Sequence, residues 1–312
     1  MIYTLTLNPA VDKEYSVQHL AFDEVLRASN MQVDFGGKGF NVSRMLAVLG
    51  ASSIAIGMAG GNNGDLLREG LESAGIHTDF VKIESDTRTN VSIVEENHGR
   101  HIKVNEPGPL VSEKEIAALI TKITLLAAPK DYWILSGSLP PGTPENVYAQ
   151  IIQFVQKSGA RAILDSSGEA LRLGCQAGPY LVKPNASEAS QISRMPAETF
   201  EDLARICQYL LTLGVKVAVI SAGKKGAFLS DGNKQWIGHP PDIKELNPIG
   251  SGDAMLAGII WQFAQGGEPA AALRWGLACG AAAASQPGTG MASKAVVKSL
   301  FDKTRIENFP NT

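Results

Sequence analysis

Short apolar stretches rich in β-branched residues alternate with longer stretches of helical periodicity along most of the chain. A strand-length stretch followed by a helix-length stretch, several times in a row, is typical of parallel strands joined by helices. The pattern therefore predicts an α/β fold, with a mostly parallel central sheet that helices cover on both faces. The expected strands are 52–58, 131–136, 161–165 and 215–221, and the expected helices are 63–74, 144–158, 186–193, 200–213, 251–265 and 268–285.

Two segments, 12–35 and 87–106, break this alternation because both look extended. Residues 91–94 and 100–104 alternate apolar and polar side chains around the turn residues 97–99, which is a hairpin pattern. We expect the two segments to form one small β-sheet, a lid over the end of the parallel sheet. Because no low-complexity linker interrupts the chain, residues 1–312 are predicted to be a single domain with this discontinuous lid.

Composition and charge narrow the class of protein. The chain has 312 residues, of which 44% are hydrophobic and 19% charged, as is usual for globular proteins. Its 28 Lys and Arg residues nearly balance 31 Asp and Glu residues, so charge does not favour nucleic acid or an anionic membrane as a partner. Residues 1–7 do not resemble a signal peptide, no long apolar run suits a membrane helix, and three separated cysteines form no metal or redox motif. We expect a cytoplasmic enzyme with buried thiols.

The segment 247–258, NPIGSGDAMLAG, is the strongest candidate for chemistry. Its glycine-rich turn leads directly into an apolar helix, and the unpaired N–H groups of a helix start form a seat for an anion. An acidic side chain weakens such a seat, unless it takes a proton from a hydroxyl group that attacks a bound phosphoryl group. Asp253 is therefore the candidate base and 250–252 the candidate anion hole, although an ordinary helix start with a first-turn Asp explains the pattern too.

A second glycine-rich segment, GGKGFN at 36–41, joins a predicted strand to a predicted helix. Glycines let the backbone approach a ligand closely. Within the segment, Lys38 is a candidate phosphate ligand, and Asn41 either binds sugar hydroxyls or caps the helix. The segment is not a Walker A loop, and the chain has no complete GxGxxG motif, which argues against a nicotinamide-dependent oxidoreductase.

Polar residues also follow other predicted strands. Asp12 stands where ligands usually bind in α/β sheets, so it either binds sugar hydroxyls or forms an Asx turn. Asn185 and Glu188 are three residues apart, which suits oxygen ligands of Mg²⁺ and equally suits a helix capping box. In the predicted lid, Arg88 and Lys103 are either solvated or bind a phosphate that the substrate carries. Small residues at two further strand ends include Ser138, Ser221, Gly223 and Gly226.

These segments together resemble the PfkB, or ribokinase-like, family of carbohydrate kinases. The pairing of GGKGFN at 36–41 with GSGD at 250–253 carries the resemblance, which spans essentially the whole chain. Further motifs are similar to the branch that contains 1-phosphofructokinases, tagatose-6-phosphate kinases and the minor 6-phosphofructokinases. They are TLNPAVD at 6–12, TRTNV at 87–91, NEPGP at 105–109, SGSLPPG at 136–142, DSSGEAL at 165–171 and VKPNASE at 182–188.

The resemblance implies ATP-dependent phosphorylation of a ketohexose phosphate, with Mg²⁺ as the metal and a homodimer formed through the β lids. It implies that Asp253 is the catalytic base. The implied anion hole is Gly250, Ser251 and Gly252, and the implied metal ligands, through water, are Glu188 and Asn185. The implied substrate-binding residues are Asp12, Gly36, Gly37, Lys38, Asn41, Arg88, Lys103 and Ser138. The implied ATP-binding residues are Lys183, Asn185, Ser221, Gly223 and Gly226.

Within this branch we expect fructose 1-phosphate as the substrate, with tagatose 6-phosphate and fructose 6-phosphate as alternatives. Val25 stands where minor 6-phosphofructokinases tend to carry Lys, which disfavours fructose 6-phosphate. Pro248, Ile249 and Ser251 depart from the family pattern, and because Pro lacks an N–H group, the departure bears on nucleotide fit and rate rather than on reaction type. A regulator that binds sugar phosphate and nucleotide without turnover is the alternative of another class, and the intact Asp253 argues against it.

Overall fold

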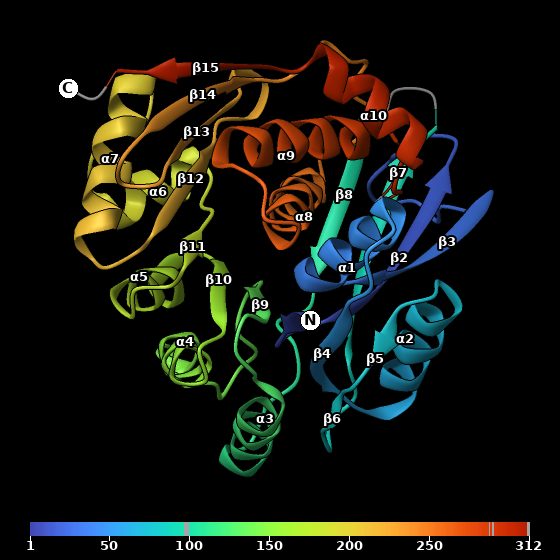
Figure 1. The fold of residues 1–312 in the computed structure, drawn as a ribbon. Coiled ribbons are helices and arrows are strands. Elements are labelled where there is room, and N and C mark those ends of the chain that lie inside the picture. The colour runs from blue at the N-terminus through green and yellow to red at the C-terminus, as the bar shows by residue number, and fades with distance from the viewer. Residues whose placement is uncertain (97–99, 287, 289, 311–312) are drawn as a thin grey trace.

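The computed structural model describes residues 1–96, 100–286, 288 and 290–310. Most of these residues form one large sheet with helices on both faces, as the alternating pattern predicts (Figure 1). The strands of this sheet are β1 (Ile2–Thr6), β4 (Ile54–Ala59), β5 (His77–Thr78), β6 (Val81–Lys82), β9 (Tyr132–Ser136), β10 (Arg161–Asp165), β11 (Leu181–Val182), β12 (Val217–Ser221), β13 (Ala227–Ser230), β14 (Gln235–His239) and β15 (Arg305–Phe309).

The strand order is β15-β14-β13-β12-β11-β10-β9-β1-β4-β5, and β6 also pairs with β4. Every pair from β12 to β5 is parallel, whereas β13, β14 and β15 add an antiparallel edge. The carboxyl ends of the parallel strands therefore meet along one edge of the sheet, which is where α/β proteins usually bind ligands.

Two layers of helices bury the large sheet. Helices α3 to α7 pack on one face, and α1, α8, α9 and α10 pack on the other. The helices are α1 (Lys38–Leu49), α2 (Gly61–Ser73), α3 (Glu113–Leu126), α4 (Val147–Lys157), α5 (Gly168–Gln176), α6 (Ala186–Ser193), α7 (Phe200–Thr212), α8 (Ser251–Ala264), α9 (Pro269–Ala284) and α10 (Lys294–Lys303), with the short 3₁₀ helix η1 (Gly223–Lys225). No helix in the described parts of the chain is long and apolar enough to cross a membrane.

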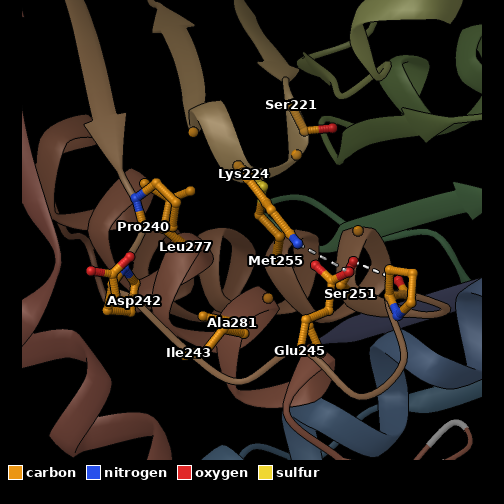
Figure 2. A pocket seen from close by; sticks show the side chains of 17 residues that line it. Ser221, Lys224, Pro240, Asp242, Ile243, Glu245, Ser251, Met255, Leu277 and Ala281 are labelled. Carbon is orange, nitrogen blue, oxygen red and sulfur yellow. Dashed lines mark hydrogen bonds and ion pairs between the residues drawn. The ribbon is translucent and has the colours of Figure 1, made fainter.

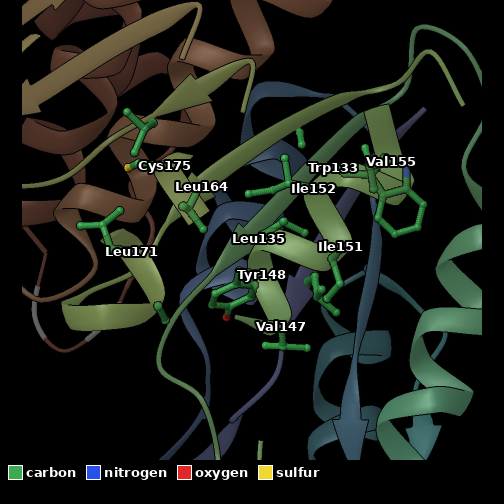
Figure 3. Packing of buried hydrophobic residues seen from close by; sticks show 14 of the residues in the cluster. Trp133, Leu135, Val147, Tyr148, Ile151, Ile152, Val155, Leu164, Leu171 and Cys175 are labelled. Carbon is green, nitrogen blue, oxygen red and sulfur yellow. The ribbon is translucent and has the colours of Figure 1, made fainter. Parts of the chain in front are cut away.

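Strand β9 shows why the central strands read as continuous apolar runs. Trp133 and Leu135 pack in the cluster under α4 (Figure 3). Tyr132 and Ile134 pack in the cluster under α8 on the opposite face. Both faces of a covered parallel sheet are buried, so neither alternate set of side chains has to be polar. Tyr148 on α4 then anchors the end of β9, because its hydroxyl donates to the carbonyl oxygens of Ser136 and Gly137 at 3.2 and 3.1 Å.

The predicted elements are present, with boundaries shifted by up to three residues. The helix expected from 144 begins at Val147, after Val147 N–H closes a turn on the Pro144 carbonyl oxygen at 3.0 Å. Sequence reasoning missed helices α3, α5 and α10 and the antiparallel edge strands. For α3 a signal was present, since Ser112 and Glu115 form a complete capping box at its start.

A separate four-stranded sheet forms from the two segments that were predicted to be extended. Its order is β3-β2-β7-β8, with β2 (Ala10–Val17), β3 (Asn30–Gly36), β7 (Arg88–Glu95) and β8 (His101–Asn105). The predicted β7–β8 hairpin pairing is confirmed, while its expected turn, 97–99, lies outside the described residues. Because β2 begins only a few residues after β1 ends, the small sheet starts at the carboxyl edge of the large one (Figure 1).

Candidate active site

Asp253 lies in the first turn of α8 and is buried, with 5% of its surface exposed. Gly250 is the residue just before the helix, and its φ of 78° is in the left-handed region that glycine tolerates. The Ser251 hydroxyl donates to the Pro248 carbonyl oxygen at 2.7 Å, so the serine that departs from the family pattern braces this turn. From α1, Asn41 Nδ2 donates to Asp253 Oδ2 at 2.9 Å. The two glycine-rich segments predicted from sequence therefore meet in space.

A second buried carboxylate, Asp165, lies near Asp253. Asp165 ends β10, and its side chain is 1% exposed. Two lysines flank it: Lys38 Nζ lies 3.3 Å from Oδ1, and Lys183 Nζ lies 3.3 Å from Oδ2. Sequence reasoning placed Lys38 and Lys183 in the site but assigned no role to Asp165. The one available signal was its position as a carboxylate at the end of a predicted strand.

The electrostatic setting of Asp253 suits a proton acceptor. The pKa of Asp253 is raised to about 6, chiefly by burial and next by the nearby Asp165 carboxylate, while Lys38, the Asn41 hydrogen bond and Lys183 oppose the rise. The Asp165 carboxylate in turn raises the pKa of Lys38, so this ammonium group stays charged. A carboxylate whose pKa approaches neutrality is a stronger base than an exposed one and is still ionised at neutral pH.

The start of α8 also forms a seat for an anion. A Cβ atom on Gly252 would lie 3.4 Å from Lys183 Nζ, so the buried lysine points at the first helical turn. The N–H groups of a first turn lack partners within the helix, and the helix dipole adds partial positive charge there. An ammonium group beside these N–H groups is the arrangement that a phosphoryl group requires.

A pocket of about 280 Å³ lies at the start of α8, where Ser251 and Met255 line it (Figure 2). Three residues expected on the nucleotide side, Ser221, Gly223 and Gly226, line it together with Ser251 and Gly252. Its remaining wall is largely apolar and is formed by Pro240, Pro241, Ile243, Met255, Leu277 and Ala281, among others. Backbone N–H groups at a helix start next to a largely apolar wall suit a nucleotide, since a base buries its rings against apolar surface.

Asn185 and Glu188 form the capping box of α6. Asn185 Oδ1 accepts from the Glu188 N–H group, and Glu188 Oε2 accepts from the Asn185 N–H group, each at 2.9 Å. The capping interpretation is thus confirmed, and it leaves Glu188 Oε1 outside the reciprocal pair. Glu188 also raises the pKa of Lys38, so this carboxylate lies within electrostatic range of the buried cluster. A half-buried carboxylate oxygen at this edge fits a hydrated divalent metal.

The small sheet contributes Asp12 on β2. Asp12 Oδ1 accepts from Asn90 Nδ2 at 2.7 Å, and a Cβ atom on Gly36 would lie 2.1 Å from Asp12 Oδ2. Glycine is therefore required at 36 for Asp12 to reach the Gly36–Gly37 turn at the start of α1. Several oxygen atoms near the same strand ends are buried without a hydrogen-bond partner among the described residues: Asn8 Oδ1, Asn41 Oδ1, Asn90 Oδ1 and Ser136 Oγ.

The three cations that were named as candidate phosphate ligands, Lys38, Arg88 and Lys103, lie in two places. Arg88 and Lys103 both lie near Asp12 and lower its pKa, whereas Lys38 pairs with Asp165. The Arg88 guanidinium donates to three carbonyl oxygens: those of Asn8 at 2.9 Å, Pro9 at 3.4 Å and Glu106 at 2.7 Å. It therefore holds the ends of β1 and β8 together. Ser138 is exposed in the turn after β9.

Comparisons with known proteins identify relatives that match nearly the whole chain. The profile of the pfkB family carbohydrate kinases matches residues 1–295. A 1-phosphofructokinase from Borreliella burgdorferi is 35% identical over 285 residues, which cover 91% of this chain and 92% of that protein. The crystal structure of phosphofructokinase-2 from Escherichia coli is 32% identical, with a TM-score of 0.92 over 96% of this chain and 98% of that one. A possible 1-phosphofructokinase from Thermotoga maritima is 26% identical, with a TM-score of 0.88 over 99% of this chain and 100% of that one.

The match to the family profile covers nearly the whole chain, and the fold agrees with phosphofructokinase structures from end to end. The chain is a member of the pfkB family of carbohydrate kinases, a sugar kinase of the phosphofructokinase type that transfers a phosphoryl group from ATP to a hydroxyl group.

Proposed function

We propose that this kinase converts fructose 1-phosphate to fructose 1,6-bisphosphate, with Asp253 as the catalytic base. The observation that carries the proposal is the buried Asp253 carboxylate, held by Asn41 next to the Lys183–Gly252 anion seat. The 35% sequence identity to the 1-phosphofructokinase from Borreliella burgdorferi supports fructose 1-phosphate as the sugar.

The roles of the residues follow from their places. Asp253 accepts the proton of the sugar hydroxyl as that oxygen attacks the γ-phosphoryl group in line. Residues 250–252 and Lys183 stabilise the negative charge on the transferred group from the helix start. Lys38, held by Asp165, adds positive charge beside the reacting atoms. Asn41 keeps the Asp253 carboxylate in place, because its side chain has a direct hydrogen bond to it.

On the substrate side, Asp12, Gly37 and Asn41 bind the sugar hydroxyls in this proposal, and Ser138 contacts the sugar from the turn after β9. Arg88 and Lys103 bind the phosphate group that the substrate already carries. Both cations act on the charge of Asp12, so they share its side of the site. Arg88 has five N–H donors, and three guanidinium nitrogens already hold carbonyl oxygens, so the remaining hydrogens serve the phosphate.

ATP occupies the pocket beyond the anion seat, with its phosphates toward Ser221, Gly223 and Gly226. Glu188 and Asn185 hold Mg²⁺ through water in this proposal, since Mg²⁺ usually keeps several water ligands. When bound, the metal neutralises charge on the ATP phosphates.

We further propose a homodimer formed through the small sheet. Met31, Ile102 and Val104 are exposed on one face of this sheet, and their exposed fractions are 55%, 36% and 61%. An apolar sheet face of this kind marks an interaction site. Sedimentation analysis should show a dimer that Val104→Asp dissociates, and a wild-type monomer would contradict this part of the proposal.

The sugar is tested by a coupled ADP-release assay with Mg²⁺ and ATP against fructose 1-phosphate, tagatose 6-phosphate, fructose 6-phosphate and fructose. The proposal requires the highest kcat/KM with fructose 1-phosphate. A higher value with another phosphorylated sugar would keep the kinase and replace its substrate, and preference for free fructose would also remove the phosphate roles of Arg88 and Lys103.

A further inference from the structure

Asn90 belongs to a row of polar residues that crosses all four strands of the small sheet. The register pairs Asp12 on β2 directly with Asn90 on β7, and it extends the row to Asp34 on β3 and Asn105 on β8. Side chains at paired positions lie on the same face of a sheet. Asn90 is the buried member of the row, with 7% of its surface exposed, whereas Asn105 is exposed.

Asn90 holds Asp12 through a direct hydrogen bond. Its Nδ2 atom donates to Asp12 Oδ1 at 2.7 Å, the short distance expected when the acceptor is charged. On the opposite side, Asp12 Oδ2 lies so close to Gly36 that a Cβ atom there would be 2.1 Å away. One carboxylate oxygen is therefore taken by Asn90, and the other is directed at the Gly36–Gly37 turn.

The other end of the Asn90 amide argues against a purely structural role. Asn90 Oδ1 is buried and has no hydrogen-bond partner among the residues that the structure describes. Leaving a buried acceptor unpaired costs about 1–3 kcal/mol, which an apolar side chain of similar size would avoid. The hydrogen bond to Asp12 is the interaction that offsets this cost.

We propose that Asn90 is a positioning residue for sugar binding, which orients the Asp12 carboxylate so that its free oxygen accepts hydrogen bonds from the hydroxyl groups of the sugar phosphate. The inference rests on the proposed function, in which Asp12 binds the sugar. Asn90 acts through Asp12 rather than on the reacting atoms, so its removal weakens sugar binding more than turnover.

A carboxylate in place of the amide makes the role testable by pH. Charged groups face Asp12 from each strand packed near it: Lys103 on β8, Arg88 on β7 and Asp34 on β3. Burial raises the pKa of Asp12, and the hydrogen bond from Asn90 lowers it. In the Asn90→Asp variant two carboxyl groups face each other at hydrogen-bond distance and cannot both ionise cheaply. At acidic pH a shared proton restores the hydrogen bond to Asp12, and at alkaline pH the two charges repel.

The experiment is a calorimetric titration of the full-length protein with fructose 1-phosphate, without ATP. Each variant is compared with wild type at the same pH, which removes the effect of the ligand's own ionisation. Asn90→Ala should weaken binding about tenfold at every pH, the cost of one charged hydrogen bond. Asn90→Asp should bind within about threefold of wild type near pH 5.5 and at least about tenfold more weakly near pH 8.5. Asn30→Asp, the same change at an exposed position of β3, is the matched control and should bind as wild type does at both pH values.

Steady-state kinetics completes the test. The KM for the sugar should follow the calorimetric affinities, while kcat and the KM for ATP change less than about threefold. Unchanged affinity in Asn90→Ala would overturn the inference, and so would an Asn90→Asp variant that is equally weak at both pH values, because a packing defect does not depend on this proton. If wild type neither binds nor phosphorylates any of the phosphorylated sugars, the proposed function fails and the inference fails with it. If wild type does both and the variants match it, the inference alone fails.

Discussion

The two sides of the Asp253 turn are built from different parts of the chain. On the proposed sugar side, polar side chains converge from separate strands and helices: Asn41 and Asn90 are buried, and Asp12 is partly buried. On the nucleotide side, glycines and small or apolar residues leave backbone and open space, as at Gly223 and Gly226. In the proposed function, the sugar is therefore recognised through oriented hydrogen bonds, and the nucleotide through shape and backbone N–H groups. Substitutions that shorten a side chain should therefore impair sugar binding, and substitutions that add a side chain should impair nucleotide binding.

The largest effect is expected at Asp253, which both sides share. Asp253→Asn keeps the shape and the Asn41 contact but cannot accept a proton, so kcat should fall about 10² to 10⁴-fold. Affinities for the sugar and ATP should change far less, and ADP release together with calorimetric titration measures both. A variant that turns over at a near-normal rate would remove the base from the mechanism.

The same residue should shape the acidic side of the pH profile. Because the pKa of Asp253 is raised to about 6, the carboxylate is ionised above this value and protonated below it. The kcat of wild type should therefore fall by about tenfold for each pH unit below pH 6.

The effect of the Asp253 pKa on stability has the opposite sign: a raised pKa favours the folded state at low pH, and this stabilisation is lost as the pH rises through about 6. Asp253→Asn should therefore unfold at a higher temperature than wild type near pH 8, and a lower temperature would contradict the assigned environment.

Local patterns in the sequence predicted the elements and the individual motifs, because strand and helix periodicity and glycine-rich turns are short-range features. They could not show that Asn41 and Asp253, 212 residues apart, share a hydrogen bond. Asp165 stayed without a role for the same reason, since Lys183 reaches it from the end of the neighbouring strand β11 and Lys38 reaches it from the start of α1. The contact of Asn90 with Asp12 could not be predicted either, because it depends on the register of β2 against β7.

On the nucleotide side, two glycines of one turn form a matched pair. Both have positive φ, 112° at Gly226 and 57° at Gly223. A Cβ atom on Gly226 would lie 2.0 Å from the Gly238 carbonyl oxygen, whereas one on Gly223 would have nothing within 4 Å. Gly226→Ala must move backbone in the pocket wall and should raise the KM for ATP about tenfold, while Gly223→Ala meets only left-handed strain of about 1–2 kcal/mol and should raise it about threefold or less. Equal effects of the two substitutions on the KM for ATP would show that the shape of this wall does not determine nucleotide binding.

The smallest effect is expected where the nucleotide side does carry charge. Lys224 Nζ and Glu245 Oε1 form an ion pair of 3.6 Å at the pocket (Figure 2), and the Lys224 side chain is 81% exposed. Exposed pairs contribute about 0–1 kcal/mol. Glu245→Gln frees the lysine for the ATP phosphates and removes a repelling charge, so the KM for ATP should fall about two- to threefold at low salt.

Salt separates this electrostatic effect from a change of shape. The decrease should disappear near 1 M salt, where the screening length is about 3 Å. Glu145→Gln, at an exposed position outside the residues that line the pocket, controls for net charge and should leave the KM for ATP unchanged at low salt. A decrease that persists at high salt would mean that Glu245 acts through the shape of the pocket, and nucleotide recognition would then depend on geometry alone even where the pocket carries opposite charges.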